Sequence, residues 1–162
     1  MEAETTQQKR KAGAETIQRL LAFAALVILF IVFSFASPYF FTFSNVVGIL
    51  VATAVNGLLA IGVTFIIITG GIDLSVGTVM TLSSVMAAVF VKTWGLPIPL
   101  GILAGVVTGT IAGLVNGLLV TKLNLPPFIA TLGMLNVAKG LALVITDLSP
   151  IYFPLETGWN EL

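Results

Sequence analysis

Five long, uncharged and mainly apolar runs make up most of this sequence, and short polar or turn-forming segments separate them. A run of about 20 apolar residues is long enough for a helix to cross the hydrocarbon core of a membrane. In that environment only helices and closed barrels keep their backbone groups hydrogen-bonded. The sequence therefore predicts an all-α, polytopic membrane protein with about five transmembrane helices, some broken at glycine or proline. The expected spans cover residues 17–38, 46–69, 74–91, 97–121 and 127–145.

Composition supports a membrane protein and excludes several classes of function. The chain is 57% hydrophobic and 9% charged, whereas soluble domains have about a quarter charged residues. A net charge of zero argues against nucleic-acid partners. Because the chain has no cysteine and no histidine, it lacks the usual residues of disulfides, metal centres and hydrolytic triads. We therefore expect no enzymatic activity, no metal and no cofactor.

The two ends of the chain are more polar than the region between them. Residues 1–16 include Lys9, Arg10 and Lys11, and we expect them to form a polar tail or surface helix. Basic residues before an apolar run are also typical of a signal peptide, but the first run exceeds the usual 7–15 apolar residues. We therefore expect an uncleaved first span, and an extracytoplasmic, truncated loop over residues 147–162.

The distribution of basic residues predicts the orientation in the membrane. Lysine and arginine beside membrane spans are enriched on the cytoplasmic side. With the N-terminus inside, only Lys92 lies outside. We therefore expect a multi-pass membrane protein with a cytoplasmic N-terminus. The basic residues on the cytoplasmic side are then Lys9, Arg10, Lys11, Arg19 and Lys122.

The octapeptide from Gly70 to Gly77 contains Asp73, the only acidic residue between Glu15 and Asp147. Consecutive glycines can end a helix, and Asp73 or Ser75 can accept hydrogen bonds from the first N–H groups of the next helix. The octapeptide therefore predicts a helix end followed by a helix start. Two explanations remain open, because the break can face a polar path through the protein or form a tight turn at the membrane surface.

Glycine interrupts the second and fourth runs in different ways. Asn56, Gly57 and Gly62 fall within residues 46–69, a run longer than one straight span requires, so we expect a tilted or broken helix there. The fourth run has glycine at every fourth position, which places these residues along one ridge where another helix can approach closely. The expected packing ridge consists of Gly101, Gly105, Gly109, Gly113 and Gly117.

The segment Val55–Leu59 (VNGLL) recurs as residues 115–119. Transporters are often built from repeats whose corresponding helices meet at the pathway, although five residues of apolar sequence can also recur by chance. Asn136 and Lys139 lie one turn apart in the fifth run. The Lys139 ammonium can reach outer headgroups from a short or tilted helix, or face a polar path beside Asn136.

Three motifs together resemble one family. They are GGIDLSVG at residues 70–77, LVNGLL at residues 114–119 and LPPFIATLG at residues 125–133. In this order they are similar to the permease subunits of bacterial ABC-type sugar importers of the ribose, xylose and galactose group, which are related to branched-chain amino-acid permeases. The resemblance covers residues 44–153, while the first forty residues match only in general character.

The resemblance implies a permease of the bacterial inner membrane that translocates a monosaccharide such as ribose. Such permeases pair as homodimers, receive sugar from an extracytoplasmic binding protein and are driven by cytoplasmic ATPase subunits, so the permease itself does not hydrolyse ATP. Family members are about twice as long, which implies that this chain is an N-terminal half without the ATPase-docking loop. The implied motif or path residues are Gly70, Gly71, Asp73, Ser75, Gly77, Asn116, Gly117, Pro126, Pro127, Thr131 and Gly133.

Two other functions remain open. A small membrane scaffold or accessory subunit would use the glycine ridge only to bind partner helices. An ion-coupled secondary transporter would favour several acids within the membrane, whereas this chain has only Asp73 between its first and last spans. The identity of the sugar and the depth of the break at residues 70–77 do not follow from the sequence.

Overall fold

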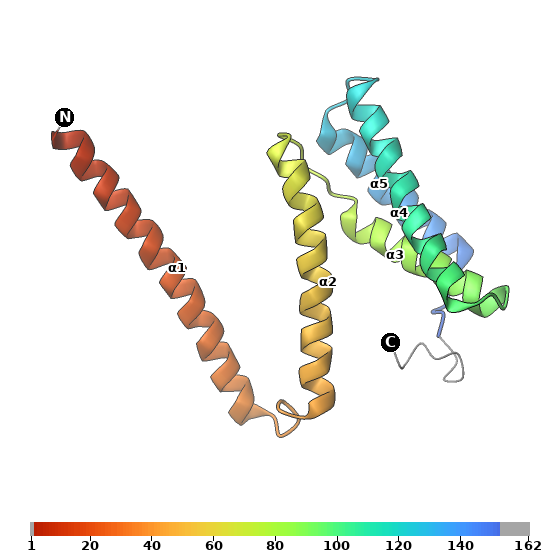
Figure 1. Ribbon diagram of the computed structural model, residues 1–162, viewed down its shortest axis with the longest axis horizontal. Helices are drawn as coiled ribbons and strands as arrows, with labels where there is room; N and C mark the ends of the chain where they lie inside the picture. Colours follow the sequence, from red (N-terminus) through yellow and green to blue (C-terminus); the bar gives the residue numbers. More distant parts are fainter. Residues whose placement is uncertain (1, 153–162) are drawn as a thin grey trace. The chain divides into compact units, whose positions relative to one another are not determined.

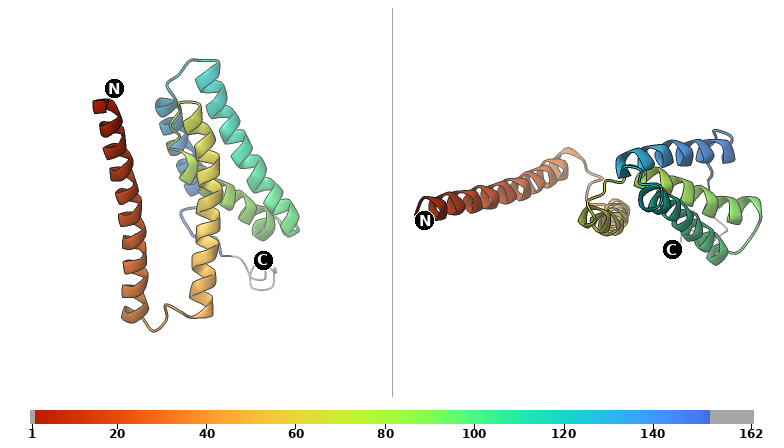
Figure 2. Two further views of the ribbon diagram at one scale, coloured as in Figure 1. Left: turned by 60° about the vertical axis from the view of Figure 1, so that its left-hand side comes forward. Right: turned by 90° about the horizontal axis from the view of Figure 1, so that it is seen from above.

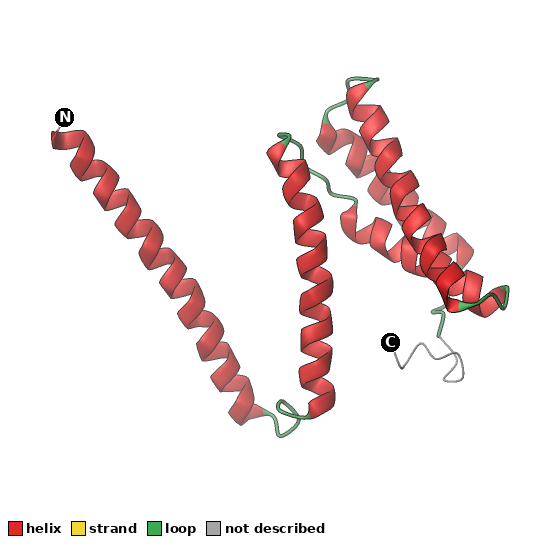
Figure 3. Ribbon diagram, viewed as in Figure 1, coloured by secondary structure: helices red, strands yellow, loops and turns green. Residues whose placement is uncertain are grey.

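The computed structural model describes residues 2–152, with side chains from Ile17 onward except that of residue 19, and in this part the chain is helical with no strand (Figures 1 and 3). This confirms the predicted all-α class. The chain divides into two compact units, residues 1–56 and 57–162, and the boundary falls inside the second helix. The helices are α1 (Glu2–Ala36), α2 (Phe43–Ile68), α3 (Val76–Ala88) with its π-helical continuation η1 (Val89–Thr93), α4 (Ile98–Thr121) and α5 (Pro127–Ile145).

Four segments are long and apolar enough to cross a membrane among the described residues: α2, α3 with η1, α4 and α5. In α1, the apolar part is the shorter stretch Leu20–Ala36. The polar residues 2–16 continue the same helix, so α1 begins well before the span expected at residue 17. Most of the expected extracytoplasmic loop, residues 153–162, lies outside the described residues.

In the first unit, an aromatic cluster joins the end of α1 to the following turn. The ring of Phe30 lies 5.0 Å from that of Phe40 and 5.6 Å from that of Phe41, both edge to face. Helix α1 ends at Ala36, because the residue before Pro38 disfavours helical geometry. The sequence mixture of proline and aromatic rings therefore forms a compact turn here.

Helix α2 is continuous from Phe43 to Ile68. The alternative of a break near Gly57 and Gly62 is therefore wrong. A glycine inside a helix costs about 1 kcal/mol, which is less than the cost of leaving backbone groups unpaired in lipid. At a rise of 1.5 Å per residue, its 26 residues extend about 39 Å, longer than the ~30 Å hydrocarbon core and consistent with a tilt.

A Schellman motif ends α2 at the double glycine. The N–H of Gly70 donates to the carbonyl of Ile67 at 2.9 Å, and the N–H of Gly71 donates to that of Ile66 at 3.0 Å. Gly70 has φ of +79°, a conformation that glycine adopts without a steric cost. The predicted helix end at these two glycines is confirmed, and helix α3 begins at Val76 as expected within the octapeptide.

In the second unit, α3, α4 and α5 pack side by side, with α3 in contact with both other helices (Figure 2). Leu82 of α3 packs against Ala138 and Ala142 of α5. Ala138 is fully buried. Small side chains on α5 allow this close approach, since association within a membrane depends on van der Waals contact between helices.

Glycines on α4 allow its backbone to touch that of α3. A Cβ atom at Gly101 would lie 2.6 Å from Cγ2 of Val91 and 3.0 Å from the carbonyl oxygen of Ala87. At Gly105 it would lie 3.1 Å from the carbonyl oxygen of Ser83. These distances leave no room for a side chain, so glycine is required by packing at this end of the helix pair.

The contact weakens along the same ridge. A Cβ at Gly109 would lie 3.3 Å from Oγ of Ser83, whereas Gly113 and Gly117 have no atom within 4 Å of the corresponding position. The expected ridge contact is therefore present from Gly101 to Gly109, and the described residues leave Gly113 and Gly117 uncovered.

This gradient predicts opposite effects of the same substitution at two positions of one helix. We expect Gly101→Ala to lower the free energy of unfolding by about 1–3 kcal/mol, because the new methyl group overlaps α3. Gly113→Ala meets open space and should be neutral or stabilising by up to about 1 kcal/mol. Thermal unfolding of both variants in detergent measures the difference, and equal melting temperatures would contradict the packing described here.

Candidate functional site

Four polar side chains from three parts of the chain lie together at one end of the second unit. We call Asp73, Ser75, Asn116 and Thr131 the Asp73 cluster. They come from the break before α3, from the last turns of α4 and from the first turns of α5. The structure thus brings together residues from all three sequence motifs, and the hydrogen bonds from the first motif to the other two join residues 41 to 59 positions apart along the chain.

Asp73 organises the start of α3. Its Oδ1 accepts two hydrogen bonds, one from the backbone N–H of Ser75 at 2.7 Å and one from the Ser75 hydroxyl at 2.6 Å. Neither of the two expected acceptors bonds an N–H group within α3: Asp73 bonds that of Ser75, the residue before the helix, and the Ser75 side chain makes no capping hydrogen bond. The N–H of Ser75 has no carbonyl acceptor in a preceding helical turn, and the Asp73 carboxylate accepts its hydrogen bond instead.

The Ser75 side chain connects the break to α4. Its hydroxyl donates to Asp73, and its Oγ accepts from Nδ2 of Asn116 at 3.0 Å. Ser75 and Asn116 are buried, at 1% and 7% exposure. The amide oxygen of Asn116 has no hydrogen-bond partner among the described residues.

Thr131 connects the break to α5. Its Oγ1 accepts from the backbone N–H of Leu74 at 3.2 Å. The same hydroxyl lies within donating distance of two carbonyl oxygens, those of Pro127 at 2.8 Å and Ile72 at 3.2 Å. A single buried side chain therefore holds the extended segment against the first turn of α5.

Two hollows lie on either side of the cluster. The wide hollow has a volume of about 520 Å³ and lies between α3 and α4, with Leu58 and Leu59 of α2 at its edge. The narrow hollow has a volume of about 270 Å³ and is lined by Ile66, Pro127 and other residues near the helix ends. Three residues line both hollows: Asp73, Gly113 and Asn116.

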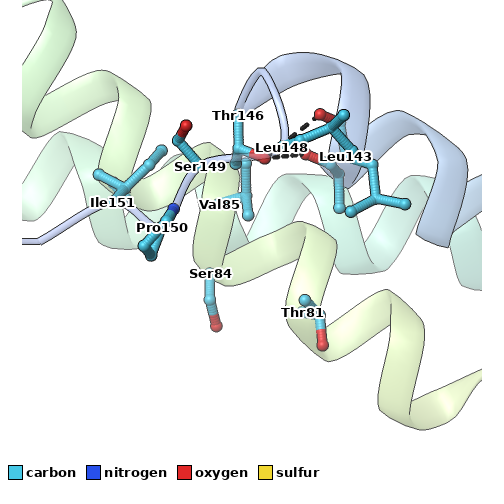
Figure 4. A pocket seen from close by; sticks show the side chains of 11 residues that line it. Thr81, Ser84, Val85, Leu143, Thr146, Leu148, Ser149, Pro150 and Ile151 are labelled. Carbon is cyan, nitrogen blue, oxygen red and sulfur yellow. Dashed lines mark hydrogen bonds between the residues drawn. The ribbon is translucent and has the colours of Figure 1, made fainter.

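A third hollow, of about 380 Å³, lies between α3, the end of α5 and the segment after it (Figure 4). Its hydroxyl groups include those of Thr81, Ser84 and Thr146. Thr81 and Ser84 donate to the carbonyls of Gly77 and Met80 in their own helix. No motif marked this hollow in the sequence, because its residues are scattered between positions 81 and 151.

The cluster lies inside the ends of its helices. Asn116 is five residues before Thr121, the last residue of α4, and Thr131 is four residues after Pro127, the first of α5. With a rise of 1.5 Å per residue, the cluster lies about 6–8 Å from those ends. Leu74 and Ser75 are therefore level with the second turn from the end of α4 and with the second turn of α5, rather than with the loop that joins the two helices.

Residues 45–149 match a family described as "Branched-chain amino acid transport system / permease component". The chain belongs to this family. It is also 48% identical over 146 residues to the ribose import permease protein RbsC of Bacillus subtilis (strain 168), covering 90% of this chain and 45% of that protein. These matches confirm the resemblance to sugar-importer permeases drawn from the three motifs.

Other relatives are similar over shorter or longer parts. Ribose import permease protein RbsC of Escherichia coli (strain K12) is 34% identical, covering 99% of this chain and 49% of that protein. The D-allose transport system permease protein AlsC of the same organism is 37% identical, covering 80% and 40%. The chain thus spans about half the length of the relatives it matches. No solved structure matches the chain.

Several residues of the family motifs lie outside the Asp73 cluster. Gly77 and Gly133 have open space beside them. Pro126 and Pro127 form the start of α5, and the predicted helix start at this proline pair is confirmed. Gly71 is buried, and a Cβ there would lie 3.1 Å from Cγ2 of Ile66.

Asn136 and Lys139 are not part of the cluster. Both side chains are exposed in the described part of the chain. The Asn136 amide donates to the carbonyl of Leu132 in its own helix at 2.9 Å, and it makes no hydrogen bond with Lys139. Of the two explanations left open for Lys139, the one that places its ammonium beside Asn136 therefore has no supporting hydrogen bond among the described residues.

The cluster predicts a stability cost for removing its central hydroxyl. In Ser75→Ala, the buried amide of Asn116 loses its acceptor, and Asp73 loses a donor. We expect a loss of about 1–3 kcal/mol in the free energy of unfolding. Ser84→Ala removes an exposed hydroxyl that bonds only to its own helix, so it should change stability by less than about 0.5 kcal/mol. Thermal unfolding in detergent tests the pair, and equal stability of both variants would contradict the role of Ser75.

Proposed function

We propose that this chain is part of the membrane-spanning subunit of an ATP-driven importer that translocates a monosaccharide such as ribose. The observation that carries the proposal is the 48% identity to a protein named as a ribose import permease, over 90% of this chain. In this proposal the permease works as a homodimer with cytoplasmic ATPase subunits and an extracytoplasmic sugar-binding protein. ATP hydrolysis then belongs to the separate ATPase chain.

The Asp73 cluster is the proposed polar part of the translocation path. Three features support this role: the cluster is polar within an apolar bundle, it lies inside the helix ends, and it borders two hollows. Gly70 and Gly71 would shape the break that carries it. The other proposed path or motif residues are Gly77, Gly117, Pro126, Pro127, Gly133, Asn136 and Lys139.

The helix order supports the proposed orientation with a cytoplasmic N-terminus. If each helix crosses once, the turn after η1 lies outside and the turn after α4 lies inside, so that Lys122 is cytoplasmic and Lys92 is not. The Asp73 cluster would then lie near the cytoplasmic end of the bundle. The proposed order of inner and outer segments follows from the alternation of the helices.

Because the described chain has no cysteine, single cysteines can report this orientation. We expect Trp94→Cys to react with a membrane-impermeant maleimide added to intact spheroplasts, since Trp94 is exposed in the turn after η1. Lys122→Cys, in the turn after α4, should react only after the membrane is permeabilised. The reverse pattern would place the N-terminus outside and refute the proposed orientation.

Sugar uptake tests the proposed function directly. The complete reading frame that contains this chain is expressed in cells that lack their ribose permease but retain the ATPase and the binding protein. We expect uptake of labelled ribose to be restored, and to be lost when the ATPase gene is also deleted. This would exclude a scaffold without transport activity.

The same cells distinguish ATP-driven from ion-coupled transport. ATP-driven uptake should persist when a protonophore collapses the ion gradient while glycolysis maintains ATP. Uptake that stops with the gradient and survives deletion of the ATPase would instead identify a secondary transporter. Absence of uptake with normal insertion in the membrane would favour the scaffold.

A further inference from the structure

The hydrogen bonds of the Asp73 cluster fix the orientation of the Asn116 amide. Ser75 has one hydroxyl proton, and Oδ1 of Asp73 accepts it at 2.6 Å. The Ser75 oxygen can then act only as an acceptor towards Asn116, so the amide presents its Nδ2 group, at 3.0 Å. The amide oxygen of Asn116 is consequently turned away from Ser75 and is free to accept another hydrogen bond.

That oxygen has no donor among the described residues, although the Asn116 side chain is 93% buried. Buried amide oxygens in folded proteins are nearly always hydrogen-bonded, and an unpaired one calls for an explanation. The neighbouring asparagine on α5, Asn136, has no such feature, because it is exposed and bonded to its own helix. The missing donor of Asn116 therefore comes from a group outside this part of the chain.

Asn116 lines both the wide and the narrow hollow and so lies between them. Gly113, one turn earlier on α4, also lines both, and Gly117 lines the narrow one. Both glycines have open space where a side chain would be. The volume of the wide hollow, about 520 Å³, falls within the range of ~300–1,000 Å³ that small-molecule sites occupy.

We infer that the Asn116 amide oxygen accepts a hydrogen bond from a hydroxyl group of the transported sugar. The inference rests on the proposed function. A sugar hydroxyl supplies the donor that Oδ1 lacks, and the Asp73 carboxylate beside it offers a second acceptor to a neighbouring hydroxyl. Apolar lining residues such as Val79 and Met80 give the C–H face of a sugar a surface to pack on.

In the described conformation the oxygen is covered, so the sugar reaches it when α3 and α4 separate at this level. The contact gradient between these helices favours movement here, because backbone contact is confined to the Gly101–Gly109 end. Opening at the Asn116 end breaks the hydrogen bond between Asn116 and Ser75, but no close backbone contact at Gly113 or Gly117. Binding and opening are thus coupled at Asn116.

The competing explanation is a backbone or side-chain donor from the rest of the complete permease. Ligand protection of a cysteine distinguishes the two. Gly113→Cys places a thiol in both hollows, and it is introduced into the complete permease after any cysteine elsewhere is replaced by serine. In membrane vesicles without binding protein, ribose should slow the reaction of this thiol with a small maleimide.

The Asn116→Leu substitution, made in the Gly113→Cys protein, should raise the ribose concentration for half-maximal protection about tenfold, as expected for the loss of one hydrogen bond. The matched control is Asn56→Leu, the same change within the same five-residue sequence VNGLL, at an exposed position of α2. It should leave the protection by ribose unchanged. The inference would be overturned if both variants needed the same ribose concentration for half-maximal protection. It would also be overturned if ribose gave no protection in the Gly113→Cys protein.

Deoxy sugars test the inference without altering Asn116, in case Asn116→Leu does not fold. In the Gly113→Cys protein, half-maximal protection by at least one of the 2-, 3- and 5-deoxy derivatives of ribose should need a concentration about tenfold higher than that of ribose. Equal protection by all of them would overturn the inference. The uptake assay separates the two hypotheses, because ribose uptake that is normal and independent of Asn116 refutes the role of Asn116 and leaves the proposed function intact.

Discussion

Hydrogen bonding of the backbone at the break between α2 and α3 is the constraint on which the second unit depends. In a membrane, a segment that leaves the helix must find other partners for its N–H and C=O groups. The Schellman motif pairs the N–H groups of Gly70 and Gly71, Thr131 pairs that of Leu74, and Asp73 pairs that of Ser75. Irregular backbone is tolerated here because carbonyls of α2 and the side chains of Asp73 and Thr131 supply the partners.

The same requirement explains how α3, α4 and α5 are arranged. Thr131 can reach Leu74 only if α5 begins beside the break, and Asn116 can reach Ser75 only if the last turns of α4 lie there too. At the opposite end, Gly101 and Gly105 bring the backbones of α3 and α4 into contact. Helix α3 is thus held by close packing at one end and by polar side chains at the other. The wide and the narrow hollow border the polar end, and the third hollow lies beside Ser84 and Ala88 near the other end.

Local features of the sequence were sufficient to predict the helices but not to predict the site. Long apolar runs predicted α2 to α5 to within a few residues, and the double glycine predicted the end of α2, because each depends on neighbours in the chain. The continuity of α2 through Gly57 did not follow, since the cost of a glycine is small beside that of a broken helix in lipid. Which glycines of the ridge touch α3 did not follow from the sequence either, because it depends on how α4 lies against α3.

The site itself depends on pairs that are distant in the chain. Ser75 and Asn116 are 41 positions apart, and Leu74 and Thr131 are 57 apart. Sequence analysis named all four cluster residues through family motifs, yet nothing in the motifs indicated that Asp73, Ser75 and Asn116 form a chain of hydrogen bonds. Asn116 and Asn136 are alike as asparagines in apolar helices, and only the fold shows that the first is buried with an unpaired oxygen.

Lys139 illustrates what the bundle of α3, α4 and α5 leaves open to the rest of a permease. Its neighbour Ala138 is fully buried against α3, whereas Lys139 itself is exposed. It lies about 18 Å along α5 from Pro127, which leaves roughly 12 Å to the far side of a 30 Å core. A lysine side chain extends about half that distance, so a straight α5 facing lipid does not bring the ammonium to the headgroups. Because a charge inside the membrane is costly unless water or protein surrounds it, this face of α5 is better suited to contact with water or with another helix than with lipid.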